Sequence, residues 1–184
     1  VTPVDITLFI GWPQREHAPF PSNPILPPVG TPGAATRGTD LVSAPLSSLG
    51  IGDNGACTVI GTFLLPQAAP TGAPQWLLQV DDGADINRFF IRNNGATTNI
   101  TAGRPGADAS PAGTMTAGVA FRCGISIDGA GRIASCVDGG TIQAVTGGPT
   151  SGLTTFRVGS TAAGTSNMFG EVGSIRALPF AVSD

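Results

Sequence analysis

Positive charge is scarce in this sequence, and it comes from a single residue type. The 184 residues include no lysine, and the nine arginines are outnumbered by 12 acidic residues, which gives a formal net charge of −3. Proteins that bind nucleic acid present a basic surface that displaces counterions from the phosphates. The sequence offers no such surface, so it predicts no nucleic-acid partner.

Long apolar runs are also absent. No stretch approaches the roughly 18 apolar residues of a membrane-spanning helix, so no membrane insertion is predicted. The amino terminus lacks the basic and then apolar pattern of a signal peptide. Because the first residue is Val1 rather than Met, we expect the polypeptide to begin further upstream.

Groups for acid–base catalysis are few. The single histidine, His17, lies among prolines, and Glu171 is the only glutamate after residue 36. Glycosidases need two carboxylates that face one groove, and no strand shows a pattern that would place such a pair. The sequence therefore predicts no catalytic residue, no cofactor and no enzymatic activity.

The three cysteines, Cys57, Cys123 and Cys136, have no metal-ligand spacing. Cys123 and Cys136 flank a predicted turn at residues 128–131, and a symmetric turn would place them opposite each other, where a disulfide could form. Strand alternation argues against this bond, because it turns Cys123 inward and Cys136 outward. The alternative is three reduced cysteines that pack as small apolar side chains.

Glycine and proline are abundant, with 27 and 16 residues, whereas only 11% of the residues are charged. Segments rich in β-branched and aromatic residues lie between these turn formers, which is typical of an all-β, antiparallel β-sandwich.

Residues 101–117, rich in Gly, Ala, Pro and Thr, are expected to form a long loop. Near the end of the chain, Val172 and Ile175 can both face the core only if a bulge lies near Gly173. We expect strands at residues 57–65, 75–80, 87–92, 121–127, 132–137 and 141–145.

Seven prolines lie between Pro13 and Pro32. Proline donates no backbone hydrogen bond and fixes φ, so this segment should run extended outside any sheet. Its apolar side chains Phe20, Ile25 and Leu26 are predicted to contact a neighbouring chain or the outside of the domain. We therefore assign residues 1–35 to an N-terminal strand and proline-rich connector, and residues 36–184 to the β-sandwich.

The end of the chain resembles a known family. Residues 158–160 (Val-Gly-Ser) close a strand, residues 170–179 read Gly-Glu-Val-Gly-Ser-Ile-Arg-Ala-Leu-Pro, and residues 182–184 read Val-Ser-Asp. This order resembles the last two strands of the concanavalin A-like (laminin G-like) lectin domains found in phage and prophage virion proteins. The resemblance implies a jelly-roll β-sandwich.

Two earlier segments match the same family in the same order. Residues 8–25 resemble a junction in phage fibre-like proteins, where the last strand of an upstream module is followed by a proline-containing phrase. Residues 35–46 resemble the entry segment and first strand of the lectin domain. The resemblance implies a virion structural protein, a decoration, fibre or spike component at the particle surface.

The partners implied by the resemblance are other virion proteins, further copies of this chain, with a trimer as the first guess, and a host cell-surface glycan. Two alternatives stay open: a glycan-binding adhesin for receptor recognition, and a non-catalytic module of a polysaccharide depolymerase. A hydrophobic content of 41% with so few charges also favours an oligomer. Contacts are expected at the proline-rich connector and at strand faces where Leu77, Phe89 or Phe90 point away from the core.

Lectin-like sandwiches bind sugars with amides and carboxylates at loop tips or on one sheet. Clustered oxygens of this kind could also bind Ca²⁺, but Asp-Asp-Gly is ordinary turn chemistry, and we assign no metal site. The candidate carbohydrate-binding residues are Asp81, Asp82, Asp85, Asn87, Asn93 and Asn94.

Two strand patterns predict where larger side chains point. Trp76 alternates with Leu78 and is expected in the core. Arg88 and Arg92 alternate with Phe90 and are expected to line the face of the sheet that is turned away from the core.

Overall fold

The computed structural model describes residues 41–66, 68, 74–95, 97–108 and 112–183. The predictions for His17, for Phe20, Ile25 and Leu26, and for the boundary at residues 35 and 36 lie outside the described residues. The one helix within them is the short 3-10 helix η1 (Leu46–Leu49). None of the described helices is long and apolar enough to cross a bilayer.

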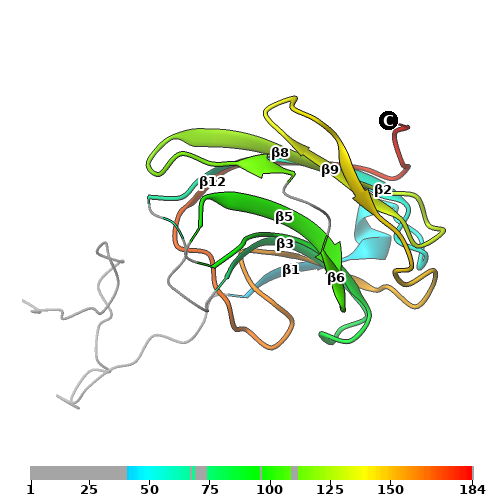
Figure 1. The fold of residues 1–184 in the computed structure, drawn as a ribbon. Helices are drawn as coiled ribbons and strands as arrows, with labels where there is room; N and C mark the ends of the chain where they lie inside the picture. Colours follow the sequence, from blue (N-terminus) through cyan, green and yellow to red (C-terminus); the bar gives the residue numbers. More distant parts are fainter. Residues whose placement is uncertain (1–40, 67, 69–73, 96, 109–111, 184) are drawn as a thin grey trace, which may run out of the picture. The chain divides into compact units, whose positions relative to one another are not determined.

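The described chain forms two antiparallel sheets that lie one above the other (Figure 1). The seven-stranded sheet has the order β1 (Val42–Pro45), β11 (Thr155–Val158), β3 (Gln75–Asp81), β4 (Arg88–Asn93), β5 (Asn99–Arg104) and β6 (Ala107–Asp108), and β7 (Gly113–Thr114) also pairs with β5. The five-stranded sheet has the order β10 (Gln143–Val145), β9 (Ile133–Val137), β8 (Ala120–Ile127), β2 (Cys57–Leu64) and β12 (Glu171–Leu178). The predicted all-β, antiparallel sandwich is therefore confirmed.

The core lies between the sheets and follows the strand alternation. Phe63 and Phe121 meet on the five-stranded sheet with ring centroids 6.1 Å apart, and Val80 and Phe89 contribute from the seven-stranded sheet. Leu77 and Phe89 are completely buried in this core. Of the three side chains considered for a partner contact, Leu77 and Phe89 therefore point into the core, and Phe90 lies outside the core cluster.

Cys123 and Cys136 lie on opposite sides of their sheet, as strand alternation predicts. Cys123 is buried and pairs with Val137, whereas Cys136 pairs with Gly124 and is only partly buried on the opposite side of its sheet. All three cysteines are free. Burial raises the pKa of Cys57 to about 12, and burial followed by the nearby Cys136 and Asp138 raises the pKa of Cys123. Both buried thiols therefore stay protonated near neutral pH and are poor nucleophiles.

The expected loop at residues 101–117 is wrong in part. Residues Asn99–Arg104 form β5, and Ile100 and Ala102 are completely buried. Glycine, alanine and threonine predict a loop, but β5 gains hydrogen bonds to β4 and buries one face in the core, and this tertiary pairing overrides local preference.

The bulge expected in the last strand is present as a register shift between Val172 and Ser174. Ile175 packs against the core, but Val172 remains 40% exposed. The bulge was therefore predicted correctly, whereas the burial of Val172 was not.

Candidate functional site

The side of the seven-stranded sheet that faces away from the core carries a second buried layer, which we call the polar face. A register shift between Trp76 and Leu78 places Leu78 in the core and pairs Trp76 with Arg92. Trp76 is only 4% exposed, yet it lies outside the main core, so its expected core position is wrong. The polar face comprises Trp76, Gln79, Asp81, Arg88, Phe90, Arg92, Asp108 and Arg157.

Two aromatic rings form the centre of the polar face. The centroids of Trp76 and Phe90 lie 5.0 Å apart. The guanidinium carbons of Arg88 and Arg92 lie 4.9 to 5.5 Å from both ring centroids, at cation–π distance. The expectation that both arginines share this face with Phe90 is confirmed. Because the guanidinium groups cover the rings, they present N–H donors at the surface in place of aromatic carbon.

Asp81 is the most deeply buried charge of the polar face, with no exposed area. Its oxygens accept hydrogen bonds from Arg157 Nε at 2.7 Å and Nη2 at 3.3 Å. They also accept from Gln79 Nε2 and from the Gly83 backbone N–H, both at 2.8 Å. A buried carboxylate is tolerated only with such pairing, so the network fixes both Gln79 and Arg157.

Asp85 joins the β3–β4 connection to the 159–170 loop, which links β11 to β12. Its carboxylate accepts from Gln79 Nε2 at 2.9 Å and Arg88 Nη1 at 2.6 Å, and from the backbone N–H groups of Ala162 and Ala163 at 3.0 Å each. Figure 1 shows both segments on the side of the seven-stranded sheet that faces away from β2 and β8. The loop therefore closes over part of the polar face.

The surroundings of Asp85 also set its acidity. Partial burial raises the pKa of this carboxyl group, but the hydrogen bonds from Gln79, Ala163 and Ala162 and the charge of Arg88 outweigh the effect of burial. The pKa of Asp85 therefore lies below its ordinary value, and the group is ionised at neutral pH.

Unpartnered polar atoms concentrate in the polar face and in the 159–170 loop. Seven buried side-chain nitrogen or oxygen atoms of the described residues have no hydrogen-bond partner, and six of them belong to β3, β4 or the 159–170 loop. Such atoms are costly, at roughly 1–3 kcal/mol each, and native proteins keep few of them. The six atoms are Trp76 Nε1, Gln79 Oε1, Arg88 Nε, Arg92 Nε, Ser160 Oγ and Asn167 Oδ1.

The structure separates the six candidate sugar-binding residues. Asp81 and Asp85 belong to the network of the polar face, and Asn87 Nδ2 donates to Asp82 at 3.1 Å at the exposed tip of the same hairpin. At the other end of β4, Asn93 is buried and Nδ2 donates to the carbonyl groups of Thr97 and Asn99, and Asn94 follows on the exposed turn. Their role in sugar binding stays a prediction.

Three residues of the polar face, Gln79, Asp108 and Arg157, drew no site prediction from the sequence. Gln79 offered a signal, because a polar residue that alternates with buried ones in an apolar strand points away from the core. Arg157 reaches the face through the pairing of β11 with the distant strand β3, and Asp108 reaches it through the local pairing of β6 with β5. Trp76 was assigned to the wrong side. Among the described residues, no group of three or more His, Cys, Asp or Glu side chains is arranged to hold a metal ion.

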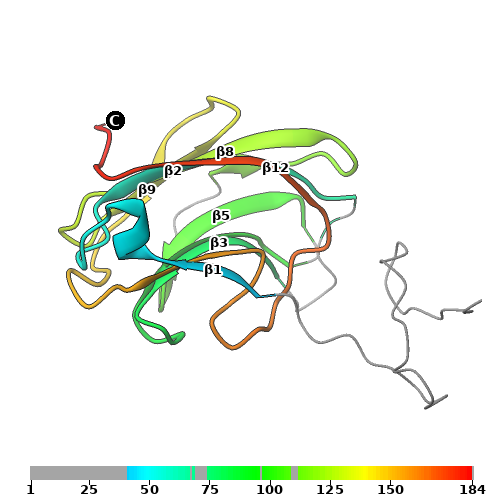
Figure 2. The same ribbon diagram turned by 180° about the vertical axis from the view of Figure 1, so that it is seen from behind.

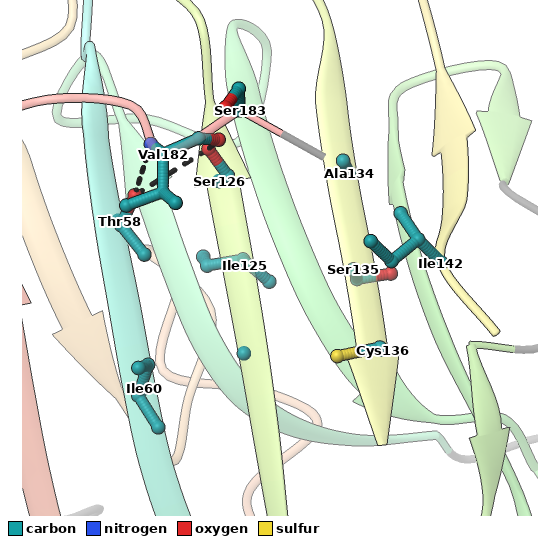
Figure 3. Close-up of a pocket in the computed structure, with 11 residues that line it drawn as sticks. Thr58, Ile60, Ile125, Ser126, Ala134, Ser135, Cys136, Ile142, Val182 and Ser183 are labelled. Carbon is teal, nitrogen blue, oxygen red and sulfur yellow. Dashed lines mark hydrogen bonds between the residues drawn. The ribbon is translucent and has the colours of Figure 1, made fainter. Parts of the chain in front are cut away.

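A second candidate lies on the outer side of the five-stranded sheet. The end of the chain crosses this side (Figure 2), where Thr58 Oγ1 accepts from the Val182 N–H at 2.8 Å (Figure 3). Thr58 Oγ1 also donates to the Phe180 carbonyl at 3.0 Å. Beside it lies an open apolar groove of about 170 Å³, lined among others by Ile60, Cys136 and Ile142. Four hydroxyl residues also line the groove, but the hydroxyl groups of Thr58 and Ser126 are bound to the end of the chain.

No protein-family model and no curated protein matches this chain. Several solved structures, however, are similar to it. The chain is similar to the NanB sialidase of Streptococcus pneumoniae, with a TM-score of 0.56 and 19% identity over 78% of this chain and 25% of that chain. It is also similar to the CBM40 module of the Ruminococcus gnavus IT-sialidase bound to α2,3-sialyllactose, with a TM-score of 0.57 and 15% identity over 75% of this chain and 82% of that chain.

A third similar structure is the heptameric SAP-like pentraxin of Limulus polyphemus, with a TM-score of 0.51 and 13% identity over 70% of this chain and 65% of that chain. The fold is a concanavalin A-like jelly roll. Identities below 20% show the fold of this jelly roll and leave its ligand to be argued from its own residues. The chain spans only a quarter of the length of the pneumococcal sialidase.

Proposed function

We propose that this jelly roll is a non-catalytic glycan-binding module and that the polar face is its ligand-binding surface. The proposal is carried by the unpartnered buried polar atoms, of which four of the seven belong to this face and two to the loop joined to it through Asp85. Sugar hydroxyls both donate and accept, so they could supply partners for amide oxygens and guanidinium N–H groups alike. Binding sites place a few fixed polar groups beside aromatic rings in this way.

The similar structures support carbohydrate as the ligand class. The CBM40 module is described in complex with α2,3-sialyllactose and also with α2,6-sialyllactose. A carbohydrate-binding module needs no catalytic group, and this agrees with the scarcity of histidine and glutamate in the sequence.

The proposal includes a location. The resemblance of residues 158–160, 170–179 and 182–184 to virion lectin domains supports a component of a phage or phage-like particle, a fibre, spike or decoration protein. Its ligand would then be a glycan of the host cell surface. A free-standing adhesin and a module of a depolymerase would use the same face.

A glycan microarray tests the proposal with matched variants. Arg92→Ala removes a donor from the polar face, where this side chain is 19% exposed. Arg176→Ala makes the same change on the other sheet, where Arg176 is exposed beside Ile60. We expect Arg92→Ala to weaken glycan binding about tenfold or more, the loss for a charge-assisted hydrogen bond, and Arg176→Ala to bind normally. Equal binding by both variants would contradict the proposal.

A further inference from the structure

The charges of the polar face are balanced pair by pair. Arg157 pairs with Asp81 at 2.7 Å, Arg88 with Asp85 at 2.6 Å and Arg92 with Asp108 at 2.5 Å. Arg104 on β5 is not one of the polar-face residues, and it donates to the carbonyl groups of Thr146 and Pro105. Among the described residues of this face, every guanidinium group therefore already faces a carboxylate.

Two of these carboxylates are held too firmly for a ligand anion to replace them. Asp81 and Asp85 each accept four hydrogen bonds, from side chains and from backbone N–H groups. Asp108 differs, because among the described residues its carboxylate bonds only to the Arg92 side chain, and its own side chain is 33% exposed. An incoming anion would meet paired arginines and three carboxylates, two of them firmly held, with Asp82 nearby at the hairpin tip.

The unpartnered atoms would be satisfied by a ligand that both donates and accepts hydrogen bonds. On the polar face, Gln79 Oε1 is an acceptor, whereas Trp76 Nε1, Arg88 Nε and Arg92 Nε are donors. In the 159–170 loop, Asn167 Oδ1 is a further acceptor. A carboxylate or sulfate only accepts hydrogen bonds, so it cannot satisfy the amide oxygens. A hydroxyl group can satisfy either kind of atom without adding charge.

We infer that the polar face selects neutral, hydroxyl-rich sugars over sugars that carry a carboxylate or sulfate group. This inference rests on the proposed function and names the class of glycan that the same surface would take.

An array of matched pairs tests this selectivity. Each pair holds one neutral oligosaccharide and the same oligosaccharide extended with sialic acid, uronic acid or sulfate, with lactose and 3′-sialyllactose among them. We expect the neutral member to bind about tenfold more tightly, and its binding to change little between low and high salt, because no net charge is recognised. Preferential binding of the acidic members would overturn the inference.

A gain-of-function variant sharpens the test. Asp108→Asn frees the Arg92 guanidinium group, and we expect it to raise affinity for the acidic members about tenfold in a salt-sensitive way. Asp138→Asn is the matched control, because it makes the same charge change beyond the end of β9 in the other sheet, at a residue with φ of 50° that asparagine tolerates. An equal gain in both variants would overturn the inference, since net charge alone would then explain it.

Different outcomes would contradict the neutral selectivity and the proposed function. Acidic preference in the native chain that is lost in Arg92→Ala would overturn the neutral selectivity and leave the polar face as the glycan site. Absence of binding to any member of the array would overturn the proposed function and the selectivity together.

Discussion

Asp85 is the residue on which the shape of the polar face depends most directly. It accepts hydrogen bonds from β3, from β4 and from the backbone of the 159–170 loop. One carboxylate therefore connects the β3–β4 hairpin to a loop that lies 77 positions further along the chain. Its ionisation is coupled to the closure of the loop.

The lowered pKa of Asp85 predicts a pH dependence of stability. A carboxyl group whose pKa is lower in the folded chain contributes fully above its unfolded pKa, about 3.9, and loses that contribution as the pH falls through the folded pKa. We expect Asp85→Asn to be less stable than the native chain at pH 6 and the difference to shrink at pH 3. Urea unfolding at both pH values measures this difference, and an unchanged difference would contradict the role given to Asp85.

The pair of Arg157 and Asp81 predicts a larger effect. Arg157→Met leaves Asp81 fully buried without its counter-charge, which typically lowers the free energy of unfolding by about 3–5 kcal/mol. The double variant Asp81→Asn, Arg157→Met should recover part of the loss, because no buried charge remains. Arg176→Met, at an exposed arginine, is the control and should change the free energy of unfolding by less than about 0.5 kcal/mol. Urea unfolding of the variants and the native chain measures these differences. A loss as small as that of the control would contradict a buried ion pair.

At the scale of the elements, the irregular positions decide which side chains reach the polar face. Alternation in β4 was sufficient to predict Arg88, Phe90 and Arg92 on one side. Alternation in β3 failed at Trp76, because the register shift after this residue depends on pairing with β4 and on the hydrogen bond from the Trp76 N–H to the Ser166 carbonyl. A bulge fixed by partners distant in sequence leaves no local signal in the strand itself.

The start of β12 predicts a strict requirement for glycine. A Cβ atom at Gly170 would lie 2.1 Å from the Leu64 carbonyl oxygen and 3.0 Å from Leu65 Cδ2, whereas one at Gly173 would meet nothing closer than 3.6 Å. We expect Gly170→Ala to destabilise the chain by about 1–3 kcal/mol, since the backbone of β2 or β12 must move. Gly173→Ala is the control and should be nearly neutral. Thermal unfolding that shows equal midpoints for both variants would contradict the described close approach.

At the scale of the whole molecule, the fold was more predictable than the site. Short strands with β-branched residues, such as β2, and the closing pattern at residues 170–179 identify the sandwich because they are local in sequence. The polar face is assembled from β3, β4, β6 and β11, so its ion pairs join residues up to 76 positions apart. Sequence alternation shows which side a residue takes, but it does not show which distant strand brings its partner.

The assembly state stays a prediction. Large apolar side chains remain exposed, among them Ile142, Phe180 and Val182 at 45–54%, and the chain has few charges to keep copies apart. We expect sedimentation velocity at micromolar concentration to give a mass above that of the 18.4 kDa chain, with a trimer as the first expectation. A stable monomer that does not aggregate would contradict this prediction and favour a free-standing adhesin.

The location of the ligand is the central claim, and nuclear magnetic resonance on the labelled chain tests it most directly. A neutral oligosaccharide selected from the array is titrated into the protein, and the amide shifts are followed residue by residue. We predict that the largest changes fall at Gln79, at Arg88 to Arg92 and in the 159–170 loop, with little change around Ile60 and Cys136. Changes confined to the five-stranded sheet would contradict the account.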